Sequence, residues 1–546
     1  MKAIVETLGQ RIEYLLPRST KGAIPKWPPD VFCICAAVLQ ASGAYSAVLN
    51  DNPPHGPGQT RKARLAQVKK LGQAWRKVAL NKRAVPIQLA KWWEIVVKHS
   101  QLPLAEIKNC STCLLALMNL LAAADEASAE LGRYFSWTHP SDAYGDEAER
   151  LLFTGSIDLE DGATLCQAIP ASKGRVLPKM HTPQNGLTIR SLSRNLAYTY
   201  SPDINPEWLS AAIDNGHHCF NLLAIPWPMK LDSTQFKASR SVEIGDVLTD
   251  RAYGLFTFIP SRGPSIEFVR SLVEEAESKV GHVDGIVFPE LAMSRSEFDH
   301  LSQEFVTENR FLISGVGTPA KSSNKSGTNQ ALMKVAVRLS DKELIRVIFE
   351  QKKHHRWRLT KSQILQYGLA SSLHPGASWW EHIAVAGRTL SFVTFRRWLT
   401  MSVLICEDLA RPDPVGDVLR SVGPNLIIAL LCDAPQLMSR WPGRYAGALA
   451  DDPGSSVLTL TSLGASKLSK PSSGGPDKCR TIALWKDAKN GAQELELPEG
   501  ASALLLSLSV EHQIERTADG RGDGEMNGFP VLAGVHPVYE RIDPND

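Results

Sequence analysis

Hydrophobic and polar positions follow two different rhythms along this chain of 546 residues. In its first part, apolar residues recur at mixed spacings of three and four, the period of helices that bury one face. Breaks that contain proline and glycine separate four such stretches, at 29–50, 60–83, 86–100 and 104–128. The pattern predicts a mostly helical N-terminal domain over residues 1–185.

From about residue 219 the rhythm changes, and short apolar runs alternate with amphipathic stretches. The runs predict strands, and they lie at 220–226, 253–259, 285–289, 311–316, 331–339, 344–349, 401–406, 426–431, 456–461, 481–485 and 503–508. Between two of them, Ser265 to Val280 places its apolar residues on one helical face, and Gly281 closes that helix. Strands that alternate with helices predict a layered α/β domain over 219–512.

Two further segments complete the predicted organisation. Residues 186–218 form a connecting segment, in which Asn-Pro-Glu-Trp at 205–208 predicts a helix start, with proline at the first helical position and Gly216 past the end. Residues 513–546 are polar and predict a C-terminal tail.

The near-neutral charge of the chain bears on whether it binds nucleic acid or a membrane surface. The 60 basic and 57 acidic residues give a net charge of +3, which by itself indicates no nucleic acid and no membrane surface. The stretch from Arg61 to Arg83 contains no acid, and it could bind a nucleic acid or an acidic partner. We favour a solvated helix face with its apolar side buried, so nucleic acid is not expected. The longest apolar run, Leu114 to Ala124, is too short to span a bilayer.

Nine cysteines are an odd and modest number for this length, which argues against a disulfide framework and favours a reducing, cytoplasmic location. Cys33 and Cys35, like Cys110 and Cys113, lie in apolar helical stretches without a second pair at zinc-site spacing. We therefore expect these four side chains to pack in the core, and we expect no metal and no cofactor.

Reactive side chains follow three of the predicted strands. Glu290 comes after the run 285–289, Lys352 and Lys353 after 344–349, and Cys406 ends the run 401–406. In open α/β folds, reactive groups gather beyond the carboxyl ends of the strands. A thiolate can attack as a nucleophile, a carboxylate can take its proton, and an ammonium can stabilise the developing oxyanion. The three groups together suit acyl-transfer chemistry.

This order of Glu, Lys and Cys, with Pro-Glu-Leu at 289–291, Lys-x-His at 353–355 and Leu-Ile-Cys-Glu-Asp at 404–408, resembles the nitrilase (carbon–nitrogen hydrolase) superfamily. The segments at 423–428, 440–464 and 481–487 are also similar to the strands and helix that follow the cysteine in that family. The resemblance covers about 219–512. It implies a nitrilase-like α-β-β-α sandwich that forms a homodimer or a larger homo-oligomer.

The resemblance also implies roles for individual residues. Glu290 would be the general base, Lys353 would bind the oxyanion, and Cys406 would attack the carbon of an amide or a nitrile. The backbone N–H of Glu407 would complete the oxyanion hole. The intermediate would be a thioester or a thioimidate, and water would release it.

Two assignments stay open at this point. Many members of the superfamily use a second glutamate before the cysteine strand, and Glu381 is the matching candidate. Lys352 and Lys353 each have a histidine two residues further on, and we prefer Lys353 because it lies deeper in the turn. Each candidate also has a structural alternative, since a cysteine can be core packing, a glutamate a helix cap or a salt-bridge partner, and a lysine part of a solvated run.

The sequence thus predicts a hydrolase of a non-peptide carbon–nitrogen bond, with a small-molecule amide or nitrile as substrate. Acyl transfer to an amine is a second enzymatic prediction, because an amine can capture the same thioester. The alternative class is a catalytically weak scaffold or sensor module, for example in bacterial defence. In that alternative the sandwich dimerises and the N-terminal helices bind a protein partner.

Overall fold

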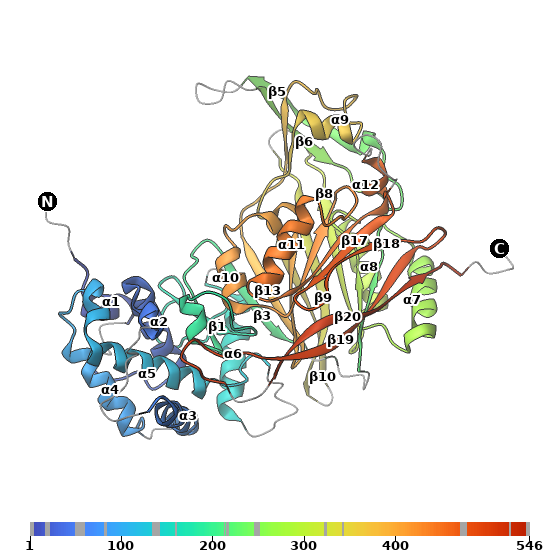
Figure 1. The fold of residues 1–546 in the computed structure, drawn as a ribbon. Helices are drawn as coiled ribbons and strands as arrows, with labels where there is room; N and C mark the ends of the chain where they lie inside the picture. Colours follow the sequence, from blue (N-terminus) through green and yellow to red (C-terminus); the bar gives the residue numbers. More distant parts are fainter. Residues whose placement is uncertain are drawn as a thin grey trace.

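A computed structural model describes most of the chain. The described residues are 5–16, 22–49, 60–80, 84–133, 142–158, 161–211, 213, 218–244, 252–321, 325–340, 343–469, 478–522 and 526–541. Within them the N-terminal helices lie at one end of the molecule and a small sheet at the opposite end, with two large sheets between (Figure 1).

Two seven-stranded sheets form the body of the protein. The first runs in the order β10 (Glu343–Lys352), β9 (Thr328–Ser340), β8 (Phe311–Thr318), β7 (Gly285–Val287), β4 (Phe220–Ala224), β19 (Ala503–Ile514) and β20 (Met526–Val538). The second runs in the order β18 (Gly491–Glu496), β17 (Thr481–Asp487), β16 (Ser456–Thr461), β15 (Leu426–Leu431), β14 (Leu399–Ile405), β13 (Thr389–Arg396) and β3 (Asn205–Ser210). All eleven apolar runs of the sequence lie on strands of the structure.

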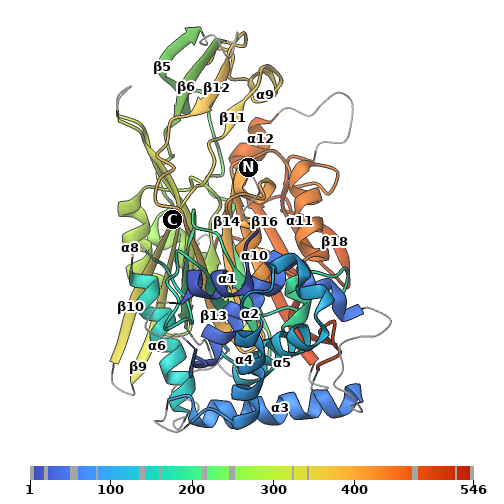
Figure 2. The same cartoon turned by 90° about the vertical axis from the view of Figure 1, so that its left-hand side faces the viewer.

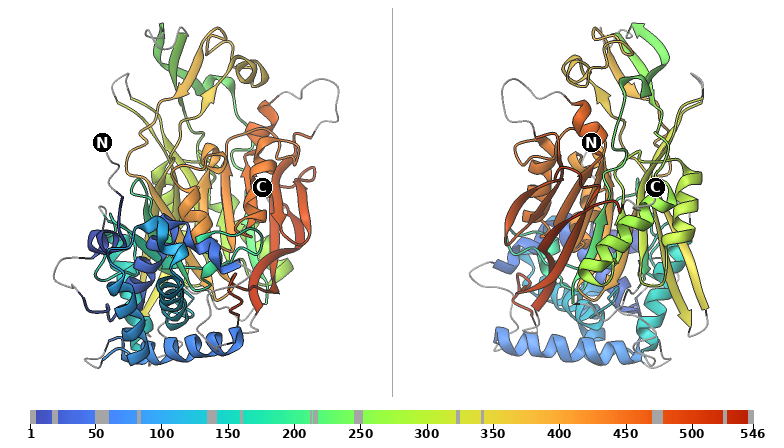
Figure 3. Two further views of the ribbon diagram at one scale, coloured as in Figure 1. Left: turned by 60° about the vertical axis from the view of Figure 1, so that its left-hand side comes forward. Right: turned by 90° about the vertical axis from the view of Figure 1, so that its right-hand side faces the viewer.

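The two sheets pack face to face through one apolar core. Leu222 and Ile313 of the first sheet meet Val403 and Ile428 of the second in this core. Alternate side chains of these strands point outward, where helices cover them. On the first sheet these are α7 (Ile266–Val280) and α8 (Arg295–Phe305), and on the second α10 (Gly416–Val422) and α11 (Trp441–Asp451) (Figure 3). The layers are therefore helix, sheet, sheet and helix, which confirms the predicted α-β-β-α sandwich.

The helical N-terminal region packs onto the second sheet. Its helices are α1 (Leu8–Leu15), α2 (Pro28–Ser42), α3 (Arg61–Val78), α4 (Ile87–Lys98), α5 (Ser111–Ala127) and α6 (Ala143–Ile157), with 3-10 turns at Ala44–Leu49 and Leu104–Asn109. One continuous core joins them to the outer face of that sheet, including Leu404 and Ile427. Figure 2 shows α3 along the outer edge of this region. Its buried side includes Val68 and Trp75, as expected for a helix with one solvated face.

The predicted helix start at 205–208 is wrong. These residues begin strand β3, which pairs in parallel with β13 from Asn205 opposite Thr389 to Ser210 opposite Thr394. Burial alternates along β3, as expected for a strand between solvent and core. Pro206 is tolerated because β3 is the last strand of its sheet, where a missing backbone N–H costs no ladder bond on the open side.

The sandwich also extends beyond 219–512. Strand β3 lies within the segment predicted as a connection, and β20 lies within the segment predicted as a polar tail, where it pairs antiparallel with β19. Strand β20 is again the last strand of its sheet, and the prolines at 530 and 537 that hide its pattern are tolerated there. Between these strands, Arg521 forms ion pairs with Asp125 (2.6 Å) and Glu126 (3.1 Å) of α5, so the C-terminal segment is fixed to the N-terminal helices.

A smaller sheet stands above the sandwich. It runs in the order β11 (Arg358–Leu359), β12 (Ser378–Glu381), β6 (Ala252–Phe258) and β5 (Phe236–Ile244), and the short helix α9 (Lys361–Gln366) accompanies it (Figure 2). Its aromatic core contains Trp357, Tyr367 and Trp379 and reaches down to Leu291 and Ala434 of the sandwich. We call this unit the cap, since it is packed onto loops at the strand ends. No helix among the described residues is long and apolar enough to cross a membrane.

Candidate active site

The three predicted strand ends converge at one edge of the sandwich. Glu290 follows β7 and Lys353 follows β10, both in the first sheet, and Cys406 follows β14 in the facing sheet. Strands β7 and β8 are parallel, and two antiparallel pairings bring β10 into the same direction as β8. Their carboxyl ends therefore lie at the same edge, which brings a carboxylate and an ammonium together although 63 residues separate them.

Lys353 lies between two carboxylates. Its Nζ is 2.8 Å from Oε1 of Glu290 and 2.8 Å from Oε2 of Glu381, and all three side chains are at most 3% exposed. The structure thus brings together three of the predicted site residues. A buried charge is costly unless it is paired, and here the cation and the carboxylates stabilise each other.

Two further groups hold this cluster, and the sequence reasoning did not find them. The Asn329 amide nitrogen donates to Oε1 of Glu290 and to Oε1 of Glu381, at 2.8 Å each. The backbone N–H of Cys432, beyond the end of β15, donates to Oε2 of Glu290 at 2.7 Å. This last bond links the two sheets across the site. The polar pair Asn-Gln at 329–330, directly before the apolar run 331–339, was the available signal for Asn329.

The thiol of Cys406 sits where strand β14 turns into a 3-10 helix over Cys406–Ala410. Its side chain is 4% exposed, and its φ of 44° lies in the left-handed region that residues with a side chain seldom adopt. Leu291, next to Glu290, has a φ of 56°. Such conformations cost free energy and are frequent at functional sites. The backbone N–H of Glu407 belongs to this turn, while its side chain pairs with Arg411 on the surface.

Electrostatics join the thiol to the charged cluster. Burial, and then the nearby carboxylate of Glu290, raise the pKa of Cys406 well above its usual value, while Lys353 acts against them. Burial also raises the pKa of Glu290, with Glu381 adding to the effect. Burial alone would lower the pKa of Lys353, but the two carboxylates outweigh it and raise that pKa well above its usual value. The resting site therefore holds a thiol, a permanent cation and a carboxyl group of raised basicity.

The cap holds Glu381 in place. Strand β12 ends at Glu381 and pairs in parallel with β6, and the backbone N–H of Trp357 donates to Oε2 of Glu381 at 3.1 Å. The cap segment between Lys353 and Cys406 is thus the part of the chain that delivers the second glutamate to Lys353.

Gly315 of β8 allows the turn that carries Glu290 to lie close to that strand. A Cβ at Gly315 of β8 would lie 2.3 Å from the Cα of Glu290 and 2.6 Å from the carbonyl oxygen of Pro289. The backbone N–H of Gly315 donates to that same oxygen at 3.0 Å. Only a residue without a side chain allows the turn that carries Glu290 to approach β8 so closely.

The contacts of the two candidate lysines favour Lys353 over Lys352 as the site residue. Lys353 contacts both glutamates, whereas the half-buried Lys352 is the last residue of β10 and points away from them, toward Gly387. Asp408, two residues after Cys406, accepts hydrogen bonds from the backbone N–H groups of His354 and His355 at 3.0 to 3.1 Å. These bonds fix the turn that carries Lys353.

Within the described ranges, no group of three or more His, Cys, Asp or Glu side chains could hold a metal ion. Cys33, Cys35 and Cys113 are buried in the core of the helical region, as expected, whereas Cys110, also predicted there, is only partly buried and packs against that core.

No family model and no curated protein matches the chain. Among solved structures, similar chains include a mutant of an amidase from the nitrilase superfamily of Nesterenkonia AN1 and Nit3 of Saccharomyces cerevisiae, a member of branch 10 of that superfamily. The amidase is 10% identical with a TM-score of 0.31, and Nit3 is 12% identical with a TM-score of 0.29. Each similarity covers 54% of this chain and 92% of the other.

Similarity at these TM-scores decides nothing about activity, and the two packed sheets with their outer helices carry the fold assignment. The body of this protein is an α-β-β-α sandwich, the architecture expected from the resemblance of its sequence motifs.

Proposed function

We propose that this protein is a cysteine-dependent hydrolase that cleaves a non-peptide carbon–nitrogen bond, in an amide or a nitrile, through a covalent intermediate on Cys406. One observation carries the proposal: Lys353 lies 2.8 Å from both Glu290 and Glu381, in a buried cluster whose charges reach the thiol of Cys406. A merely structural cysteine on a core strand needs no such surroundings.

The chemistry follows from the positions of the three groups. Glu290 takes the proton of the thiol as the sulfur bonds to the substrate carbon, and Lys353 with the backbone N–H of Glu407 stabilises the oxygen that becomes negative. As the carbon–nitrogen bond breaks, Glu290 gives the proton to the leaving amine and a thioester remains. A nitrile gives a thioimidate instead, which takes up one water and loses ammonia to give the same thioester. Water then attacks the thioester, passes a proton to Glu290, and releases the acid while the sulfur regains its proton.

The raised pKa of the thiol makes a general base necessary. A thiol that stays protonated near neutral pH is a poor nucleophile, so its reaction depends on transfer of the proton to a neighbouring group. The raised pKa of Glu290 brings that carboxylate closer to the thiol in basicity, which favours the transfer.

Alkylation by iodoacetamide tests the proposal without knowledge of the substrate. Cys406 is buried and Cys219 is partly exposed, so exposure alone predicts that Cys219 reacts first. We expect Cys406 to react at least tenfold faster, as measured by peptide mass spectrometry. Glu290→Gln should remove this advantage, whereas Glu350→Gln, at a surface glutamate paired with Arg295, should keep it. Labelling that simply follows exposure would contradict the proposal and favour a binding module.

A further inference from the structure

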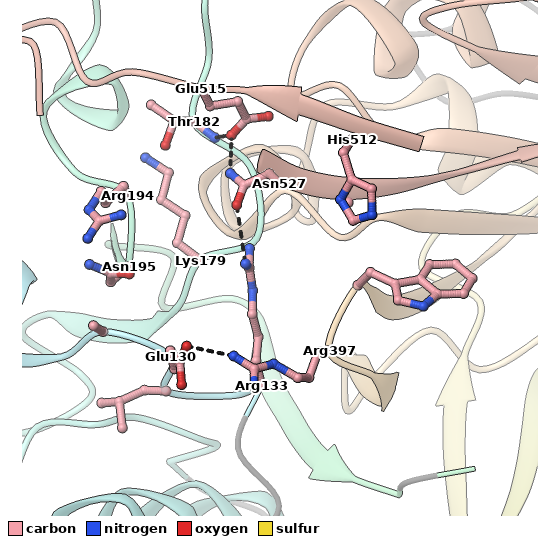
Figure 4. Close-up of a pocket in the computed structure, with 14 residues that line it drawn as sticks. Glu130, Arg133, Lys179, Thr182, Arg194, Asn195, Arg397, His512, Glu515 and Asn527 are labelled. Carbon is pink, nitrogen blue, oxygen red and sulfur yellow. Dashed lines mark hydrogen bonds and ion pairs between the residues drawn. The ribbon is translucent and has the colours of Figure 1, made fainter. Parts of the chain in front are cut away.

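A second group of buried charges lines a cavity of about 320 Å³ that shares no residue with the candidate active site. Four parts of the chain meet around it: the segment after α5 at 129–133, the segment 179–195, the turn at 397–398, and the β19–β20 hairpin at 512–528. In Figure 4, Lys179, Arg194 and Asn195 lie on one side of the cavity and His512 and Asn527 on the other.

Two cations of this cavity have no counter-charge in contact. Lys179 is 2% exposed, and its Nζ donates to the carbonyl oxygens of Arg190 and Ser193, the latter at 2.7 Å, and to the hydroxyl of Ser193 at 3.2 Å. Arg133 donates to the carbonyl oxygen of Met180 at 2.7 Å and to Oδ1 of Asn527 at 3.3 Å. Neither side chain forms an ion pair with any carboxylate in the described part of the chain. Burial of such cations is costly, and it lowers the pKa of both, that of Lys179 to about 7.

Both carboxylates that line the cavity already have hydrogen-bond or ion-pair partners within the protein. Glu515 accepts from His181 (2.8 Å), the backbone N–H of Thr182 (2.7 Å) and Asn527 (2.7 Å). Glu130 pairs with Arg397 at 2.6 Å (Figure 4). The lining contains four cationic side chains and two carboxylates. Arg194 has its counter-charge in Glu126 at 3.2 Å, so Lys179 and Arg133 are the two cations of the lining without an ion pair to any described residue.

Backbone conformation gives a second, independent observation. Three residues other than glycine have a φ in the left-handed region among those described, namely Glu130, Leu291 and Cys406. Leu291 and Cys406 belong to the candidate active site, and Glu130, with a φ of 67°, lines this cavity. Such conformations persist where the surroundings hold them and are concentrated at functional sites.

We propose that this cavity is a second binding site, which takes a small molecule that carries a phosphate group. A phosphate dianion brings two negative charges, one for each of the two cations that lack a carboxylate partner among the residues described. Lys179 supplies a point charge, Arg133 and Arg397 supply guanidinium groups that can face phosphate oxygens, and Asn195 and Thr182 are polar neighbours. Because the ligand would contact both the helical region and the hairpin, it would stabilise their junction.

Phosphate binding to the full-length protein tests the proposal, by calorimetry and by thermal unfolding. Inorganic phosphate and glycerol 3-phosphate should bind and raise Tm, and sodium chloride at the same ionic strength should not. Lys179→Met should weaken binding at least tenfold. Lys334→Met is the matched control, since Lys334 is also a buried lysine that donates to a hydroxyl, that of Ser302, but lies outside the cavity.

Arg397→Gln decides the matter if Lys179→Met does not fold, because Arg397 is 60% exposed and its removal leaves the core unchanged. It should weaken phosphate binding severalfold. Cys406→Ala should leave the affinity unchanged, which separates this site from the active site. Tighter binding of glycerol 3-phosphate than of inorganic phosphate supports an organic ester, and the reverse supports the free ion. No binding, equal binding by Lys179→Met and Arg397→Gln, or tighter binding of succinate would overturn the proposal.

Discussion

Two buried lysines of this chain lie in opposite electrostatic environments. Lys353 is fully buried between the carboxylates of Glu290 and Glu381, and its pKa rises well above the usual value. Lys179 is almost equally buried among backbone carbonyls, and its pKa falls to about 7. Burial acts in the same direction on both, so the difference comes from the carboxylates that the protein supplies in one place and not in the other.

The comparison separates two uses of buried charge. Around Lys353 the protein itself supplies the counter-charges, and Asn329 and the Cys432 N–H donate to the carboxylate of Glu290. Such a fixed arrangement suits chemistry, because the groups need no reorganisation when charge develops. Around Lys179 and Arg133 the balance is incomplete, which suits a site that a charged ligand completes.

Removal of each lysine gives the largest expected contrast. Lys353→Met leaves two buried carboxylates facing each other, so we expect it to lower the free energy of unfolding by about 3–5 kcal/mol. Lys179→Met removes a buried cation without a counter-charge but leaves the carbonyl oxygens of Arg190 and Ser193 without its hydrogen bonds, so we expect a smaller loss, of about 1–2 kcal/mol at pH 7. Urea unfolding of the two variants measures the difference. Equal destabilisation by both substitutions would contradict the comparison.

Gly315 tests how closely the fold holds the carboxylate of that cluster. Gly315→Ala places a methyl group 2.3 Å from the Cα of Glu290, and backbone atoms must move to accept it. We expect a loss of about 2–3 kcal/mol in urea unfolding, together with loss of the selective alkylation of Cys406. Gly447→Ala, on helix α11, is the control, because the added methyl group would lie 3.7 Å from the side chain of Met438, an ordinary contact distance. That substitution should be neutral or stabilising. Slower labelling of Cys406 in both variants would show that the effect is not specific to Glu290.

The sequence predicts most inner strands of the sandwich because they are buried on both sides and read as continuous apolar runs, as β14 and β15 do. The partly exposed edge strand β10 is also predicted from its apolar run, whereas the edge strands β3 and β20 escape the same reasoning. Strands β3 and β20 are half exposed and contain proline, and they resemble a helix start and a polar tail. The cap strand β12 is only Ser378–Glu381, too short for any period to show.

The candidate site divides in the same way. Glu290, Lys353 and Cys406 can be predicted because each follows an apolar run and matches a motif. The tertiary fold brings Asn329 and the N–H of Cys432 to the site. The local sequence does not show which backbone N–H at a strand end will donate to a catalytic side chain. The cavity around Lys179 is built from four distant segments, so nothing in its local sequence indicates it.

The pH dependence of stability distinguishes the two lysines further. The pKa of Lys179 is lower in the folded state than in the unfolded chain, so the unfolded chain binds more protons between about pH 7 and 10.5, and stability rises with pH in that window. The pKa of Lys353 is raised, so its contribution is complete below the unfolded pKa and is lost only as pH rises through the folded value.

We therefore expect the gain in stability between pH 7 and pH 9 to be about 1–2 kcal/mol smaller in Lys179→Met than in the unsubstituted protein. Urea unfolding at the two pH values measures it. Sodium sulfate should reduce the same gain if an anion holds the proton on Lys179. A pH slope that Lys179→Met does not change would place the titration elsewhere.

Asn329 gives the smallest effect and the finest test of the active-site cluster. Its amide donates to both glutamates, and this hydrogen bond lowers the pKa of Glu290 against the effect of burial. In Asn329→Ser the pKa of Glu290 should rise, and the free energy of unfolding should fall by about 1 kcal/mol. Because Glu290 must be ionised to accept the thiol proton, the alkylation rate of Cys406 should then reach its plateau at a higher pH. If the alkylation rate falls at every pH but still reaches its plateau at the same pH, Asn329 only supports the structure. The basicity of Glu290 is then set by Lys353 and Glu381 alone.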